Sequence, residues 1–352
     1  MKLIAAFFGA LVLSGPAVAA DAFEPTKFVN VFVGTDFNGH TYPGATWPMG
    51  MVQPSPDSGW TTWGHCSGYR LKDAALYGFS QTHLSGTGIG DLMDVLLQPY
   101  SGEDGDVHHR GLKADETGEP GYYAVTYTNF GVRAELTASR RVAYHRYTFS
   151  RGDARVLVDL ASGMDGTWYR PAGSWPSNRV VEAQCDFEGD RKLVGWNVVS
   201  SWLKGRRVNY VVEFSRPIAW KRRAPATQDG QIAPRWELGF ALDKGESLEA
   251  RIAISPADVA GARRNLAAEP TAFDFDARRK DCQEAWRTLL SKAVIEGDEE
   301  QKRIYYTALY HAYVQPNLFS DVDGRCRFTD NAAGLSGGAV YARKSLTASS
   351  CT

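Results

Sequence analysis

The sequence has no excess of charge of either sign, because 40 acidic residues balance 39 basic ones. Domains that bind nucleic acid usually carry a basic patch, so this balance gives no sign of a nucleic-acid partner. Beyond Leu13, no stretch approaches the roughly 20 apolar residues that a membrane-spanning helix needs. The sequence therefore predicts no nucleic-acid binding and no transmembrane segment.

Several common catalytic signatures are also missing. No GxSxG, HExxH or P-loop lysine motif occurs, and the five cysteines (66, 185, 282, 326 and 351) show no CxxC spacing. A glycine-rich segment at 86–90 is similar to a phosphate-binding loop, but no strand leads into it and the next segment has strand character. We expect at most one disulfide, with the other cysteines buried as small apolar residues.

The N-terminus has the features of a secretory signal peptide. Lys2 precedes an apolar run that ends at Leu13, and the small residues at 17–20 suit a cleavage site. We therefore expect residues 1–20 to be a signal peptide and the mature protein to be secreted or periplasmic.

The chain is rich in aromatic residues, with Trp, Tyr and Phe making up 12% of its 352 residues. This length has room for one large domain or two ordinary ones. Proteins that bind carbohydrate are often aromatic-rich, because the C–H faces of sugars stack on aromatic rings. Buried aromatics in an ordinary β core give the same composition, so composition alone leaves both readings open.

Residues 29–99 are dense in Gly, Pro, Trp, His and Asp and contain few long apolar runs. Such a stretch is typical of long ordered loops, held in fixed shapes by Gly and Pro. We expect these loops to present aromatic and polar side chains at a surface.

From about residue 121 the pattern changes to alternating apolar and polar residues separated by Gly, Asp and Pro turns. Antiparallel strands with this period predict a large β-sandwich, which we place at 21–255 together with the long loops. The expected strands are 123–127, 132–137, 142–149, 155–160, 179–187, 193–202, 207–214 and 248–254.

A helical period begins near residue 256. We expect helices at 257–269 and 273–293, and a third one beginning at Asp298 and ending before Pro316. Residues 256–296 then form a helical linker, and 297–330 begin a second domain. The apolar faces of the helices within 274–314 are expected to need a partner beyond the sandwich. Residues 331–352 show neither a helical nor a strand period, and we expect them to be an aberrant or disordered tail.

The opening stretch closely resembles the N-terminal domain of glycoside hydrolase family 92, the calcium-dependent exo-α-mannosidases. The resemblance rests on NVFVGT (30–35), HTYPGA (40–45), PMGMVQPSP (48–56), CSGY (66–69) and GFSQTHLSGTG (78–88). A second island, YYTALYH (305–311) with PNLFSDVDGR (316–325), resembles the start of the family's helical domain.

The resemblance implies a mainly β fold: a large antiparallel β-sandwich, linker helices and the truncated start of an (α/α)6 barrel. It also implies inverting removal of terminal mannose from mannose-containing glycans, with Ca²⁺ gripping vicinal hydroxyls. In the family both catalytic carboxylates and the main calcium ligands lie in the barrel, beyond residue 352. We therefore assign no catalytic residue and no metal ligand, and expect a missing C-terminal catalytic half as partner. The alternative is a carbohydrate-binding β-sandwich module that does not hydrolyse, or a nonfunctional remnant.

Two residues are candidate substrate contacts. Trp63 matches a family position where an indole borders the subsite beyond the cleaved bond, and its alternative role is a loop anchor. His83 could hydrogen-bond substrate hydroxyls or orient a neighbouring loop, and the alternative is a structural histidine bonded to backbone. Capping or turn roles are expected for Asp36, Asp91 and Asp94. Asp321 and Asp323 with Gly324 resemble a calcium loop, but the EF-hand spacing and its terminal Glu are missing.

Overall fold

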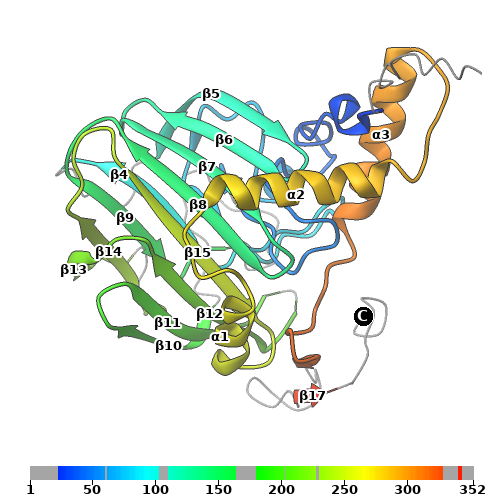
Figure 1. Ribbon diagram of the computed structural model, residues 1–352. Coiled ribbons are helices and arrows are strands. Elements are labelled where there is room, and N and C mark those ends of the chain that lie inside the picture. The colour runs from blue at the N-terminus through cyan, green and yellow to red at the C-terminus, as the bar shows by residue number, and fades with distance from the viewer. Residues whose placement is uncertain are drawn as a thin grey trace, which may run out of the picture.

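Two antiparallel β-sheets pack face to face in the computed structural model of the protein (Figure 1). The structure describes residues 23–59, 62–102, 110–163, 180–201, 203–226, 230–327 and 340–342. The six-stranded sheet has the order β1 (Ser55–Asp57), β3 (Gly78–Ser80), β4 (Leu96–Ser101), β9 (Ala154–Asp159), β14 (Arg235–Phe240) and β13 (Ile218–Arg223). The nine-stranded sheet has the order β10 (Val180–Glu188), β11 (Lys192–Val199), β12 (Arg206–Phe214), β15 (Ser247–Ser255), β8 (Val142–Phe149), β7 (Val132–Ala138), β6 (Tyr122–Tyr127), β5 (Gly111–Glu119) and β2 (Ala75–Leu76).

The hydrophobic core lies between the two sheets. Alternation places one side of each strand inward, so that Leu238 and Phe240 of β14 face the nine-stranded sheet. Phe240 meets Phe214 of β12 there, with ring centroids 5.0 Å apart. The expected fold class, a β-sandwich followed by the start of a helical domain, is confirmed.

Three helices follow the sandwich: α1 (Val259–Ala267), α2 (Phe275–Leu290) and α3 (Glu299–Val314). The start of α3 is fixed by a capping box. The Asp298 carboxylate accepts a 2.8 Å hydrogen bond from the Gln301 backbone N–H, and the Gln301 side chain accepts one from the Asp298 N–H at 3.0 Å. The helix ends just before Pro316, as expected.

The apolar face of α2 is covered by the sandwich, so the expectation that it needs a partner beyond the sandwich is wrong. The helix lies across β6, β7 and β8 (Figure 1). Its Trp286 is fully buried, donates its indole N–H to the Thr46 carbonyl at 2.6 Å and packs on Tyr310 of α3 at 4.5 Å. On α3, Ile304 remains 65% exposed.

Most side chains of the 29–99 stretch are buried, which corrects the expectation that these loops mainly present a surface. Tyr42, Cys66, Tyr69 and Phe79 have almost no exposed area. Its described residues carry the 3₁₀ turn η2 (Trp63–His65), the short strands β1, β2 and β3, and the beginning of β4. It is therefore a set of long loops folded into and against the sandwich.

Some expectations fall outside the described residues. The signal peptide at 1–20 lies there, and so does the 331–352 tail apart from β17 (Val340–Ala342), which pairs with β16 (Arg325–Arg327). Among the described cysteines (66, 185, 282 and 326), all are free thiols. In the same part of the chain, no helix combines the length and apolar character needed to cross a membrane.

Candidate functional site

The 29–99 loops are held in backbone conformations that cost energy. Among the described residues, eight that are not glycine have positive φ, and six of them lie in this stretch: Phe37, His40, Met49, Leu92, Met93 and Val95. Each such residue costs on the order of 1–3 kcal/mol and persists only where surrounding structure enforces it. Such strain gathers at binding and catalytic sites, so these loops are the candidate functional site.

A buried ion pair fixes the strained segment at 91–95. Arg206, at the start of β12, donates to the Asp94 carboxylate at 2.8 Å and lies 3.5 Å from Asp91. The Thr82 hydroxyl also donates to Asp94, at 2.7 Å. Asp91 accepts from the backbone N–H of Leu92 at 2.6 Å. Asp91 and Asp94 thus brace the loops through long-range contacts, beyond the capping or turn roles expected from the sequence.

Like Phe37, Trp63 is an exposed aromatic residue of this loop cluster. Its side chain is 42% exposed, and its indole N–H donates to the Gly88 carbonyl at 3.1 Å. The indole meets the ring of His40 at 4.3 Å and 70°. A Cβ at position 88 would come within 3.2 Å of the indole, so the glycine allows this approach. Trp63 is thus held in place by these contacts, while part of its aromatic ring stays exposed to solvent.

His40 lies beneath Trp63 and is a candidate that the sequence analysis did not single out. It has a φ of 52° and is 5% exposed, and neither ring nitrogen has a hydrogen-bond partner within the described part of the chain. Burial lowers the pKa of His40, which favours the neutral ring at neutral pH. No pattern in the sequence distinguishes this histidine from the others.

His83 is fully buried, and all its polar contacts are internal. Its Nδ1 lies 2.8 Å from the Gln53 carbonyl, and its Nε2 lies 2.9 Å from Asp57 and 3.1 Å from Ser80. A ring without exposed area cannot touch a ligand in this structure. We therefore assign His83 to loop positioning, the second of the two roles considered from the sequence.

The remaining aspartates brace loops. Asp36 pairs with Lys72 at 3.1 Å and Arg70 at 3.4 Å, and the backbone N–H of Phe37 is the main factor that lowers its pKa. Asp321 is buried between the Ser255 hydroxyl and the Asn265 amide, at 2.7 and 2.8 Å. It ties the segment after α3 to the sandwich.

No group of three or more His, Cys, Asp or Glu side chains that could hold a metal ion occurs within the described ranges. The aspartates above are committed to arginines, backbone N–H groups or neutral side chains. These side chains do not form a set of oxygen ligands suited to Ca²⁺. We therefore assign no metal-dependent chemistry to this part of the chain.

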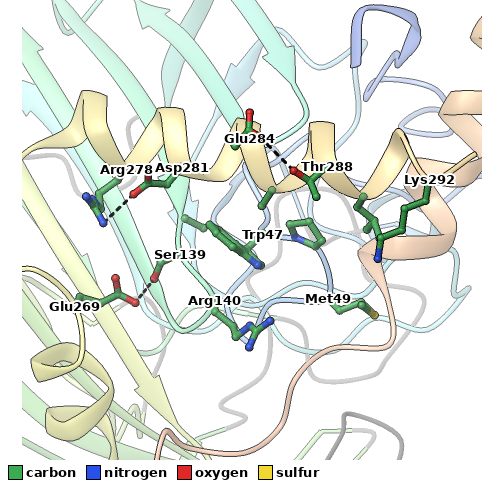
Figure 2. Close-up of a pocket in the computed structure, with 14 residues that line it drawn as sticks. Trp47, Met49, Ser139, Arg140, Glu269, Arg278, Asp281, Glu284, Thr288 and Lys292 are labelled. Atoms are coloured by element: carbon green, nitrogen blue, oxygen red, sulfur yellow. Dashed lines mark hydrogen bonds and ion pairs between the residues drawn. The ribbon is translucent and has the colours of Figure 1, made fainter. Parts of the chain in front are cut away.

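A separate groove runs beneath α2 (Figure 2). Its volume is about 670 Å³, and Trp47 and Met49 line it opposite the helix. Of its six charged side chains, Arg278 and Asp281 pair with each other at 3.0 Å, and Glu269 accepts from the Ser139 hydroxyl at 2.6 Å. Neither Trp63 nor His83 lines it, so we do not take this groove as the functional site.

The fold and its loops match a known family. Residues 28–255 match the sequence model described as "Glycosyl hydrolase family 92 N-terminal domain". The chain belongs to glycosyl hydrolase family 92. Residues 261–346 match the family's catalytic-domain model, which starts within the segment expected as linker and runs into the segment expected as an aberrant tail.

Individual relatives agree with family 92. An "uncharacterized secreted glycosidase" from Arthroderma benhamiae is 24% identical over 84% of this chain and 42% of its own length. The family 92 α-mannosidase BT3965 from Bacteroides thetaiotaomicron, solved in complex with mannoimidazole, is 29% identical. The match covers 87% of this chain and 42% of that one, with a TM-score of 0.74.

A more distant structure, described as the inverting mannosidase BT2199 from the same bacterium, has 22% identity and a TM-score of 0.73. That match covers 92% of this chain and 44% of the other, and it shows the shared fold. The chain therefore spans less than half the length of these relatives.

Proposed function

We propose that this chain is the N-terminal part of an exported α-mannosidase that removes terminal α-linked mannose from glycans. The observation that carries the proposal is membership of family 92, together with the shared fold and 29% identity to an α-mannosidase. The sandwich would supply substrate-contacting loops, and the rest of the catalytic domain would supply the chemistry.

Trp63 is the residue of this chain that we assign to substrate contact. An indole combines a flat apolar face with partly polar character, which suits a sugar ring that is apolar on one face and hydroxylated at its rim. Trp63 has the exposed area that such stacking requires, and contacts to Gly88 and His40 hold it in place. His83 acts indirectly, by fixing the loops beneath.

We further propose inversion at the anomeric carbon and dependence on Ca²⁺. An inverting hydrolase needs a general acid and a general base about 6.5–9.5 Å apart, with a water between the base and the sugar. We place this pair and the calcium ligands in the catalytic-domain residues that this chain does not include. Calcium would orient the sugar through its vicinal hydroxyls.

Export through a signal peptide at residues 1–20 completes the proposal. It is supported by the charge and apolar pattern of that segment and by the relative described as secreted.

The test is mannose release from α-linked mannobioses, followed by NMR to identify the anomer formed first. The chain continued through a complete family 92 catalytic domain should release β-mannose, and a chelator should abolish turnover. Residues 1–352 alone should release none. A full-length protein that is folded and calcium-loaded yet inactive on every α-mannoside would leave the non-hydrolytic carbohydrate-binding module as the better reading.

A further inference from the structure

Another exposed tryptophan lies on the sandwich, outside the 29–99 loops. Trp220 is on β13, the last strand of the six-stranded sheet, so no further strand of the described residues flanks it. Its cross-strand neighbour is Gly239 of β14. In Figure 1, β13 lies at the opposite end of the sandwich from α3. Trp220 is 37% exposed.

The indole of Trp220 occupies the space directly over Gly239. A Cβ built at Gly239 would come within 2.1 Å of two indole atoms, so any other residue there would displace the ring. Gly239 has no positive φ that would itself require glycine. Alternation along β14 puts Gly239 on the side opposite Leu238 and Phe240, which face the core. The indole of Trp220 therefore packs on the outer face of the sheet, over Gly239.

Charged side chains surround this indole, but their charges are matched. The guanidinium carbons of Arg155 and Arg222 lie 5.1 and 5.7 Å from the ring centroid. Arg155 pairs with Asp153 at 2.6 Å, and Arg222 pairs with the buried Glu237. Two cations face two anions, so the setting favours a neutral ligand over an anionic one.

The side chains at the rim can still reach hydroxyl groups. Arg222 and Asp153 keep 55% and 41% of their side-chain surface. An arginine has five N–H donors and a carboxylate has about four acceptor positions, so each retains capacity after pairing. An apolar face with donors and acceptors at its edge matches the surface of a pyranose ring.

We propose that Trp220 is the platform of a second carbohydrate-binding site, which takes a neutral hexopyranose glycan and is separate from the loops around Trp63. The choice of α-mannan as its ligand rests on the proposed function. Such a site would hold the protein on a polymeric substrate while chain ends are processed elsewhere.

Trp196 on β11 provides a matched control. It is also a tryptophan on a strand of the sandwich, but the Arg207 guanidinium covers its ring at 3.8 Å, and its N–H donates to Gln184 at 3.1 Å. A ring that is covered and hydrogen-bonded in this way offers no free platform.

The experiment measures retardation of the 352-residue chain in native gels that contain soluble α-mannan, at low and high salt. Trp220→Ala should weaken binding about tenfold, the effect of losing one stacked aromatic face. Trp220→Tyr should retain most of the binding, and Trp196→Ala should be retarded like the unaltered chain. Gly239→Ala, which keeps the indole but displaces it, should also weaken binding. Thermal melting checks that each variant is folded.

Several results would overturn the inference. These are no retardation of the unaltered chain, or equal losses for Trp220→Ala and Trp196→Ala. Retardation that high salt abolishes would show that charged contacts, rather than stacking on the indole, hold the polymer, and would also refute it. None of these results bears on mannose release by the full-length enzyme, which tests the proposed function separately.

Discussion

The carboxylate of Asp57 lies 2.9 Å from Nε2 of His83, with both side chains fully buried. These residues are 26 positions apart and come from two loops that the ring of His83 joins. The pair shows that His83, a candidate substrate contact in the sequence, instead braces the loops from within and gives the exposed loop residues a rigid base.

His83→Ala is therefore expected to lower the free energy of unfolding by about 2–4 kcal/mol, because it leaves the Asp57 carboxylate and the Gln53 carbonyl buried without their partner. Urea denaturation measures this loss. Ser85→Ala, a half-buried site in the same segment whose side chain makes no hydrogen bond to a described residue, should change it by less than about 0.5 kcal/mol. Equal, small effects for both variants would refute the bracing role.

Trp286→Ala should be the most destabilising change in the helical segment, at about 3–5 kcal/mol. It removes a buried indole that packs on Tyr310, and it leaves the Thr46 carbonyl with only the weak Cys282 thiol donor at 3.7 Å. Val294→Ala, at a site that is 68% exposed, is the control and should have little effect. A minor loss for Trp286→Ala would mean that α2 is not anchored to the sandwich as described.

Asp321 should make the stability pH-dependent. Burial raises the pKa of its carboxyl to about 6, above the value of about 3.9 expected in the unfolded chain. The folded state therefore binds this proton more tightly, so the group's stabilising contribution is complete below about pH 4 and is lost as pH rises through 6. The full change is about 3 kcal/mol.

Asp321→Asn cannot ionise, so its stability relative to the unaltered chain should rise between pH 4 and pH 7. Chemical denaturation at several pH values measures this difference. Asp323→Asn is the control, because Asp323 is partly exposed and pairs with Arg264 and Arg325. If the stability difference between Asp321→Asn and the unaltered chain did not change with pH, the Asp321 carboxyl would have an ordinary pKa in the folded state.

Strands and helices with a strong period could be predicted from the sequence. The strand expected at 142–149 matches β8, and Asp298 with Gln301 marks the start of α3. Strands β5, β13 and β14 were missed. The side chains of β5 and β13 give no apolar alternation, because few of them are buried. β14 is mostly buried, and its Trp236, Leu238 and Phe240 do alternate with other residues.

The candidate site was located by resemblance, but its geometry could not be predicted. Nothing local to His83 shows that Gln53 and Asp57, from a loop 26–30 residues away, enclose its ring. The contact of His40 with Trp63 likewise depends on loop conformations with positive φ, which the residue types do not specify. Long-range loop packing decides which polar residues face a ligand and which face the interior.

Trp63→Ala tests most directly whether the loop cluster contacts substrate. In the chain continued through a complete catalytic domain, loss of a stacked indole worth about 1–3 kcal/mol should lower kcat/KM on an α-mannobiose roughly five- to a hundredfold. An activated aryl α-mannoside makes few contacts beyond the cleaved bond, so its kcat/KM should fall less. A larger loss on the disaccharide is the predicted result. Equal losses on both substrates would contradict it and make Trp63 a loop anchor.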